Sequence, residues 1–437
     1  MANVRPFKGL RYNVREIEDL GAVMAPPYDS ISVDDKAKYY EIHPYNAVRL
    51  ISAMNGDGDT EDDNCFTRAA QYLQEWIDKK ILVQDPEDCI YLYEQTVTIN
   101  REQYYNRGFV LLLELSDYED GIVVPCEEPS TNSKKERFNM IKATQSNSSM
   151  ISCMYTDQGK ELSKLIKDIC EEQPELSFET PEGIRQKLWA IKYKPTIDFI
   201  VESLREKLVY IVDGHNRYEA CLDYKKYAME NDPDYSPEKS YNYILTLLSE
   251  AHEDGRVQLP IYRLIRFKKQ VREDYFVAGA QDHFKVEKII VDTTDDSMAE
   301  TMRKQIATQR KETLIAVYTG GDYFYRLRLT DREYMKKILP DKSETYCELD
   351  ITILNKLLLE EVLYITEDNG DDRITYTRNA DQGIEAVKSG EFGCMFMVNP
   401  VKQTQISGVA LAGERMPKRT VSVFPKPATG IVIHRFE

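Results

Sequence analysis

The 437-residue chain lacks any long apolar run. No stretch approaches the roughly 18 apolar residues that a membrane-spanning helix needs. The first residues, Met1 to Pro6, contain no apolar segment of the length typical of a signal peptide. We therefore expect a cytoplasmic protein with no membrane partner, and no sequence pattern specifies an oligomeric state.

The sequence also lacks the short motifs that identify common cofactor sites. Its eight cysteines are scattered without a CxxC pair, which excludes the spacing of a zinc ribbon or of a dithiol redox motif. The motifs GxGxxG, GxxxxGK[ST] and GxSxG are absent as well. Any nucleotide site must therefore be of another type.

Positive charge is in deficit. The chain has 57 Lys and Arg against 74 Asp and Glu, which gives a formal net charge of -17. A field of this sign repels nucleic acid and anionic lipid at long range, so a nucleic-acid partner is disfavoured. Because salt screens charges beyond about 8 Å, a local basic pocket can still bind a small-molecule anionic ligand.

The residues that are present describe a globular chain, with 42% hydrophobic and 30% charged residues. At roughly 150 residues per domain, the length indicates two or three domains. Segments with strand and helix periodicity predict an α/β to α+β fold. We place a first domain at 1–270, with an inserted subdomain at about 85–200, and a C-terminal α+β domain at 271–437.

The segment from Asp213 to Arg217 (Asp-Gly-His-Asn-Arg) contains several chemically active groups. The apolar run before it predicts a strand that enters a helix through a tight turn, where helix N–H groups and the Arg217 guanidinium outline an anion site. His215 can exchange a proton near neutral pH. A structural interpretation is equally supported by the spacing, since His215 or Asn216 can cap the helix and Arg217 can pair with Glu219.

Three other segments contain candidate groups. Two prolines precede Tyr28 and Asp29, which suits a preorganised polar contact but is also typical of an ordinary turn. Cys126 and Glu127 offer a nucleophile and a base, although an inert thiol is the better supported interpretation. The basic segment 133–149 can meet phosphate, and a solvated helix face is again the better supported alternative.

These segments resemble the family called domain of unknown function 1015. Its members share Pro-Pro-Tyr-Asp near the start and Asp-Gly-His-His-Arg-Tyr-Glu in the middle, which correspond to residues 26–29 and 213–219 of this chain. The resemblance covers nearly the whole chain. Its other parts are Pro44 to Leu50, Arg137 to Ser149, Leu188-Trp189, Gly413 to Pro417 and Phe424-Pro425-Lys426.

The family is described as similar to ParB and sulfiredoxin folds and, distantly, to free serine kinases. The resemblance therefore implies a ParB/sulfiredoxin-like N-terminal domain that binds nucleotide phosphates at a helix N-terminus, with ATP or ADP and Mg2+ as cofactors. The roles that it implies are catalysis by Asp29, Glu127 and His215, phosphate binding by Asp213, Gly214, His215, Asn216 and Arg217, metal binding by Asp213, and substrate binding by Tyr28 and Arg137.

Three positions depart from the family pattern. Asn216 replaces a second His, Cys126 replaces the His before Glu127, and residues 418–421 read Lys-Arg-Thr-Val where Lys-Ser-Thr is usual. Asn216 can donate a hydrogen bond but cannot transfer a proton near pH 7. The resemblance implies a phosphotransferase acting on a small hydroxyl, such as that of a free amino acid. The departures from the pattern support the alternative, a non-catalytic nucleotide-binding regulatory module. A ParB-like DNA-associated role fits the charge worst.

Overall fold

The computed structural model divides the chain into two compact units. Unit 1 comprises Met1–Pro125, Pro129–Val257 and Val423–Glu437, and unit 2 comprises Cys126–Glu128 and Gln258–Ser422. These limits differ from the predicted ones, because unit 2 begins before residue 271 and the C-terminal segment belongs to unit 1. The structure describes residues 2–99, 102–127, 131–251, 255, 257–267, 273–292, 297–307, 312–366, 370 and 372–436.

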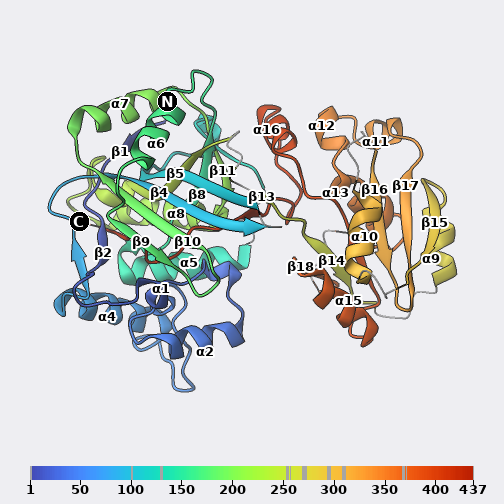
Figure 1. Cartoon of the computed structure of the whole chain (residues 1–437), viewed down its shortest axis with the longest axis horizontal. Helices are drawn as coiled ribbons and strands as arrows, with labels where there is room; N and C mark the ends of the chain where they lie inside the picture. The colour runs from blue at the N-terminus through green and yellow to red at the C-terminus, as the bar shows by residue number, and fades with distance from the viewer. Residues whose placement is uncertain are drawn as a thin grey trace. The chain divides into compact units, whose positions relative to one another are not determined.

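A nine-stranded mixed sheet forms the centre of unit 1 within the described residues (Figure 1). Eight strands follow the order β6-β11-β8-β12-β5-β4-β10-β9, and β1 pairs with β5. Several of these strands come from the region expected as an inserted subdomain. The bounds are Val4–Arg5 (β1), Ile90–Ile99 (β4), Glu102–Glu114 (β5), Val123–Pro125 (β6), Ile151–Tyr155 (β8), Leu176–Glu179 (β9), Arg185–Ile191 (β10), Val209–Asp213 (β11) and Tyr243–Glu250 (β12).

Both faces of this sheet are buried. Successive side chains of a strand point to opposite faces, and along the central strands both sets are apolar. In β5, Leu111 and Leu113 belong to one core cluster, whereas Val110 and Leu112 belong to another. The first cluster also contains buried residues of α6 (Glu161–Cys170), α7 (Lys194–Arg205) and α8 (His215–Asn231). The second contains Leu73 and Trp76 of α4 (Cys65–Asp78), so helices cover each face.

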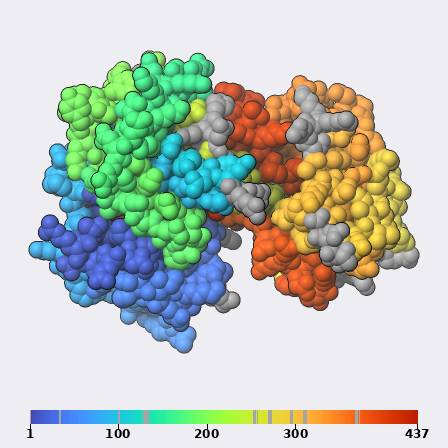
Figure 2. All heavy atoms as spheres, viewed as in Figure 1, coloured from blue at the N-terminus to red at the C-terminus, as the bar shows by residue number. Residues whose placement is uncertain are grey.

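The N-terminal segment joins the edge of the sheet. In Figure 2 the blue N-terminal residues and the green residues around β9 and β10 share the visible face of unit 1. A Cβ atom on Gly21, in α1 (Leu20–Val23), would lie only 2.1 Å from the Glu179 carbonyl oxygen of β9. Glycine is therefore needed where α1 approaches the strand.

Unit 2 is built on a second sheet, with the order β15-β17-β16-β19-β14-β18 and antiparallel neighbours. One core cluster joins this sheet to helices α10 and α15. The chain is thus a mixed α/β protein, and none of its described helices is long and apolar enough to span a membrane. The bounds are Tyr262–Ile265 (β14), Phe284–Ile290 (β15), Leu314–Tyr318 (β16), Tyr323–Leu329 (β17), Ile374–Thr377 (β18), Cys394–Met397 (β19), Met298–Ile306 (α10) and Ala380–Lys388 (α15).

Candidate functional site

The predicted turn connects β11 to α8 in unit 1. Asp213 ends the strand, His215 begins the helix, and Gly214 is the N-cap residue with φ of 93°. The N-cap position is thus occupied by Gly214, and His215 and Asn216, which the structural interpretation placed there, lie inside the helix. A Cβ atom on Gly214 would lie 2.7 Å from Ile151 Cγ2 and 3.0 Å from Arg217 Nε. Both the backbone conformation and the space therefore require glycine.

The Arg217 side chain is buried beside the turn. Its Nη2 donates to Asp213 Oδ2 at 2.6 Å, and its Nη1 donates to the Met150 carbonyl and to Ser149 Oγ, the latter at 3.3 Å. These acceptors lie close because β8 runs antiparallel to β11 and begins at the end where β11 finishes. Arg217 Nε is buried without a hydrogen-bond partner in the described part of the chain. The predicted pairing of Arg217 with Glu219 is wrong, since Glu219 pairs with Lys134.

Lys426 joins two carboxylates at this turn. Its Nζ lies 2.6 Å from Asp213 Oδ1 and also pairs with Asp29. Burial lowers the pKa of Lys426, but Asp213 and Asp29 raise it further, so the net shift is upward. For Asp213 the effects are opposite. Burial raises its pKa, but the charges of Lys426 and Arg217 bring it below the ordinary value. Lys426 and Asp213 are therefore both charged at neutral pH.

A second buried arginine completes the cluster. Arg137, on α5 (Thr131–Thr144), places its guanidinium carbon 3.8 Å from the ring centroid of Tyr28 and donates from Nη1 to the Ile51 carbonyl at 2.8 Å. Tyr28 and Asp29 belong to the 3-10 helix η1 (Tyr28–Ser30). Burial lowers the pKa of Arg137, and the charge of Arg217 adds to this effect. The Nε atom of Arg137 is buried without a partner among the described residues.

The less exposed charged side chains of this cluster are three cations and two carboxylates, and the exposed Glu136 pairs with Arg137 at 3.7 Å. Arg137, Arg217 and Lys426 face Asp29 and Asp213, and the N-terminus of the 17-residue helix α8 adds positive potential. Lys426 is the residue that the sequence interpretation did not assign to the site. In the sequence, Lys426 was indicated only by the Phe-Pro-Lys segment of the family resemblance. The cluster of cations at the N-terminus of α8 can bind a small anion.

Glu127 and Cys126 belong to unit 2, whereas the cluster at the turn belongs to unit 1. Glu127 Oε1 accepts hydrogen bonds from the backbone N–H groups of Thr420, at 2.9 Å, and Val421. Burial raises the pKa of Glu127 to about 7, although these backbone hydrogen bonds oppose the shift. Burial also raises the pKa of the Cys126 thiol, which agrees with an inert cysteine.

His215 and Asn216 occupy the first two positions of α8 and are half-buried. The charge of His215 is one of the causes that lower the pKa of Asp213, which places the imidazole near this carboxylate. Two other basic residues of α5, Lys134 and Lys142, contact α8. Lys134 pairs with Asp223 at 2.9 Å, and Lys142 lies 4.4 Å from the ring centroid of Tyr227.

Asp213 does not fit the predicted magnesium site. One of its carboxylate oxygens pairs with Arg217 and the other with Lys426. A divalent cation bound there would compete with both partners for the same oxygens. Within the residues that the structure describes, no group of three or more His, Cys, Asp or Glu side chains is arranged for a metal ion.

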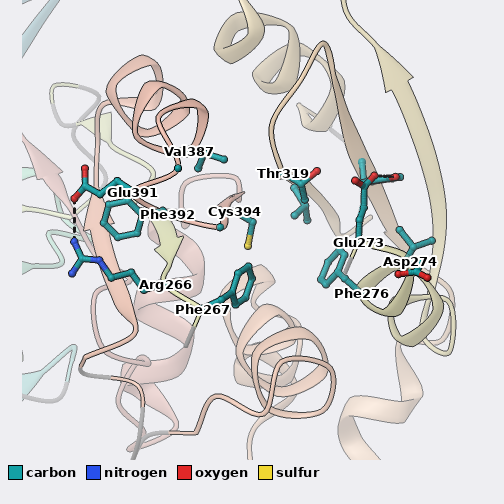
Figure 3. Close-up of a pocket in the computed structure, with 15 residues that line it drawn as sticks. Arg266, Phe267, Glu273, Asp274, Phe276, Thr319, Val387, Glu391, Phe392 and Cys394 are labelled. Carbon is teal, nitrogen blue, oxygen red and sulfur yellow. Dashed lines mark hydrogen bonds and ion pairs between the residues drawn. The ribbon is translucent and has the colours of Figure 1, made fainter. Parts of the chain in front are cut away.

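Unit 2 contains a cavity of about 1110 Å³ that includes none of the predicted site residues. Figure 3 shows the rings of Phe267, Phe276 and Phe392 among its lining, with the ion pair of Arg266 and Glu391 at 3.0 Å on one side. Its lining is partly apolar, in contrast to the charged cluster of unit 1.

Several solved structures are distantly similar to this chain. A free serine kinase in complex with AMP has 10% identity and a TM-score of 0.35 over 72% of this chain and 86% of that one. A conserved hypothetical protein from Pyrococcus furiosus has 10% identity and a TM-score of 0.32 over 72% and 90%. SbnI with C-terminal truncation from Staphylococcus aureus has 10% identity and a TM-score of 0.36 over 74% and 86%.

The comparison with family models gives a match over most of the chain. The chain belongs to the family described as Protein of unknown function (DUF1015), which matches residues 4–352. No curated protein matches the chain. The function of this chain is therefore argued from its own residues.

Proposed function

We propose that this protein binds the phosphate groups of a nucleotide, ATP or ADP, at the N-terminus of α8. The observation that supports this most strongly is Arg217, a buried guanidinium whose Nε has no partner in the described residues and which lies beside Gly214. Charge-assisted hydrogen bonds from arginine to phosphate are strong and directional. The helix N-terminus adds backbone donors and positive potential at the same point.

Asp213 has a positioning role in this proposal. Its two oxygens hold Arg217 and Lys426 at either side of the turn. The two cations keep it ionised, so it keeps both side chains in place across the neutral pH range. In this proposal Arg217, Lys426 and the N-terminus of α8 neutralise the phosphate charge, and no metal ion binds at Asp213.

A second candidate function is phosphoryl transfer to the hydroxyl of a small molecule, such as a free amino acid. Asp29 supports it, because its side chain is 27% exposed and shares Lys426 with Asp213. In this reaction the hydroxyl oxygen attacks the γ-phosphorus of ATP, the bond to ADP breaks, and Asp29 accepts the hydroxyl proton. Tyr28 and Arg137 would contact the substrate beside Asp29.

Two features favour binding without turnover over this second function. The Asp29 carboxylate is engaged in an ion pair with Lys426, and Asn216 cannot transfer a proton near pH 7. His215 and Glu127 remain predicted catalytic residues, and the ParB/sulfiredoxin-like arrangement of unit 1 remains a prediction as well.

Isothermal titration calorimetry with ADP and ATP tests the binding site. Arg217→Ala should weaken nucleotide binding at least about tenfold, as expected for a charged hydrogen bond of about 1.5 to 3 kcal/mol. Because Arg217 is buried, Asn216→Asp is the second variant. A carboxylate in the first turn favours the helix but repels phosphate, so this variant should fold and bind nucleotide more weakly. Arg205→Ala, at an exposed ion pair on α7, is the matched control.

Unchanged nucleotide affinity in a folded Asn216→Asp variant, or no binding by the unaltered protein, would overturn the proposal. Turnover is measured separately by 31P NMR with ATP, magnesium and a panel of amino acids. Asp29→Asn should abolish turnover while nucleotide affinity changes by less than about threefold. Nucleotide binding without any phosphorylated product would leave the binding function and exclude the transfer reaction for that panel.

A further inference from the structure

A second basic cleft lies elsewhere in unit 1. Its cavity measures about 500 Å³ and is formed by β1 and the residues after it, the loop before β12, and the C-terminal strand β21 (His434–Arg435). The charged side chains in its lining are Arg5, Lys8, Lys239, Arg435, Asp88 and Glu238. None of these belongs to the cluster at α8.

Two of the four cations in this cleft contact neutral groups, and Lys239 pairs with Asp232 at 3.7 Å. Arg5 donates to the Glu238 carbonyl at 3.1 Å, and its guanidinium carbon lies 3.6 Å from the ring centroid of Tyr243. Arg435 donates to the side-chain oxygen of Gln74 at 3.1 Å. In the described part of the chain, neither arginine nor Lys8 forms an ion pair with a carboxylate. These three positive charges outnumber the two negative charges, Asp88 and Glu238, in the same lining.

The histidine in the wall of the cleft does not change this balance. His434 is buried, with Nδ1 at 3.3 Å from Asn147 Oδ1. Burial lowers the pKa of His434 to about 3, and the nearby charge of Arg5 contributes to this shift. His434 is thus neutral, and the balance of the cleft stays positive in a chain of net charge -17. Like charges that line one cavity repel each other unless an anion lies between them.

We propose that this cleft is a second anion site, which binds a small phosphorylated molecule and is independent of the nucleotide site. Lysine and arginine are the usual partners of phosphate, and the hydroxyl groups of Ser236 and Ser240 in the lining supply further donors. The volume falls within the range of about 300 to 1,000 Å³ that is typical of small-molecule sites. A ligand here would connect residues near both ends of the chain and stabilise unit 1.

Binding of pyrophosphate to the full chain tests this inference. Isothermal titration calorimetry measures its affinity, and hydrogen–deuterium exchange locates it. Lys8→Gln/Arg435→Gln should weaken binding at least about tenfold, because it removes two cations from the cleft. Lys164→Gln/Lys167→Gln removes the same charge from the exposed face of α6 and should change the affinity by less than about twofold. Both altered pairs are exposed, so the fold should be retained.

The expected exchange pattern is slower exchange at residues 4–8, 236–240 and 433–436 when pyrophosphate is present. Equal weakening by the two double variants would show non-specific attraction and overturn the inference. Absence of pyrophosphate binding at millimolar concentration would do the same. Slower exchange confined to residues 213–217 would assign the anion to the proposed nucleotide site alone, whereas loss of nucleotide binding with the cleft response intact would overturn only that proposal.

Discussion

Lys426→Met is the substitution that tests the charged cluster most directly. It removes the cation and keeps most of the apolar stem. Removing one partner of a buried ion pair leaves an uncompensated charge, which costs about 3 to 5 kcal/mol when both groups are fully buried. The side chains of Lys426, Asp213 and Asp29 are 9%, 13% and 27% exposed. Solvent therefore screens part of the charge, and we expect unit 1 to lose about 2 to 3 kcal/mol at neutral pH.

This loss should become smaller in acid. In the unaltered protein, Lys426 and Arg217 hold the pKa of Asp213 below its unfolded value against the effect of burial. The stability from Asp213 is therefore present at neutral pH and is lost as the pH falls through the folded pKa. In Lys426→Met, burial is opposed by Arg217 and His215 without the lysine charge, so Asp213 is protonated at a higher pH. The difference between the two proteins should thus be smaller near pH 3 than near pH 7.

Urea unfolding followed by tryptophan fluorescence measures this effect in unit 1. Both tryptophans of the chain, Trp76 and Trp189, are buried there. Lys194→Met is the matched control, because its ion pair with Asp198 has side chains 81% and 59% exposed. Exposed pairs of this kind contribute at most about 0.5 kcal/mol. Equal destabilisation by Lys426→Met and Lys194→Met would refute the reasoning, as would a difference that grows in acid.

Two further predictions concern the turn and unit 2. Gly214→Ala should destabilise unit 1 by about 1 to 3 kcal/mol more than Gly183→Ala in urea unfolding. Both positions have positive φ, but of the two only Gly214 lacks space for a Cβ atom. Similar losses of stability in the two variants would contradict the close approach at Gly214. The pKa of Glu127 is raised to about 7 from 4.5, so stability is lost as the pH rises through this range. Glu127→Gln should therefore flatten the pH dependence of the unit 2 melting temperature in scanning calorimetry, and an unaltered dependence would count against a buried neutral Glu127.

The strand-turn-helix segment was predictable because its determinants are local. An apolar run followed by Asp-Gly predicts a strand and a turn, and β11 ends at Asp213 as expected. The helix begins at His215, directly after the turn, because Gly214 in the left-handed region ends the strand and starts the helix. The choice between an anion site and a capped turn depended on where Arg217 points. That direction is set by Met150, the residue before β8, whose carbonyl accepts a hydrogen bond from Arg217.

The contacts that complete the cluster could not be predicted in this way. Lys426 pairs with Asp29 across 397 positions of sequence and with Asp213 at the end of β11. No periodicity or turn signal connects such positions, and a lysine in a loop is typical of a solvated side chain. Arg137 illustrates the same point, because a basic helical segment favours a solvated face. The structure instead buries Arg137 against Tyr28 while Lys134 pairs with α8.

The return of the C-terminal segment to unit 1 has a consequence for how the protein can be studied. The chain leaves unit 1 after Val257 and re-enters it at Val423. A fragment that ends before Gln258 keeps Asp213 and Arg217 but lacks Lys426, so Asp213 would lose one of its two cations. The same fragment lacks His434 and Arg435, and with them one side of the basic cleft. Because both proposed anion sites need residues from the end of the chain, ligand binding has to be measured on the whole protein.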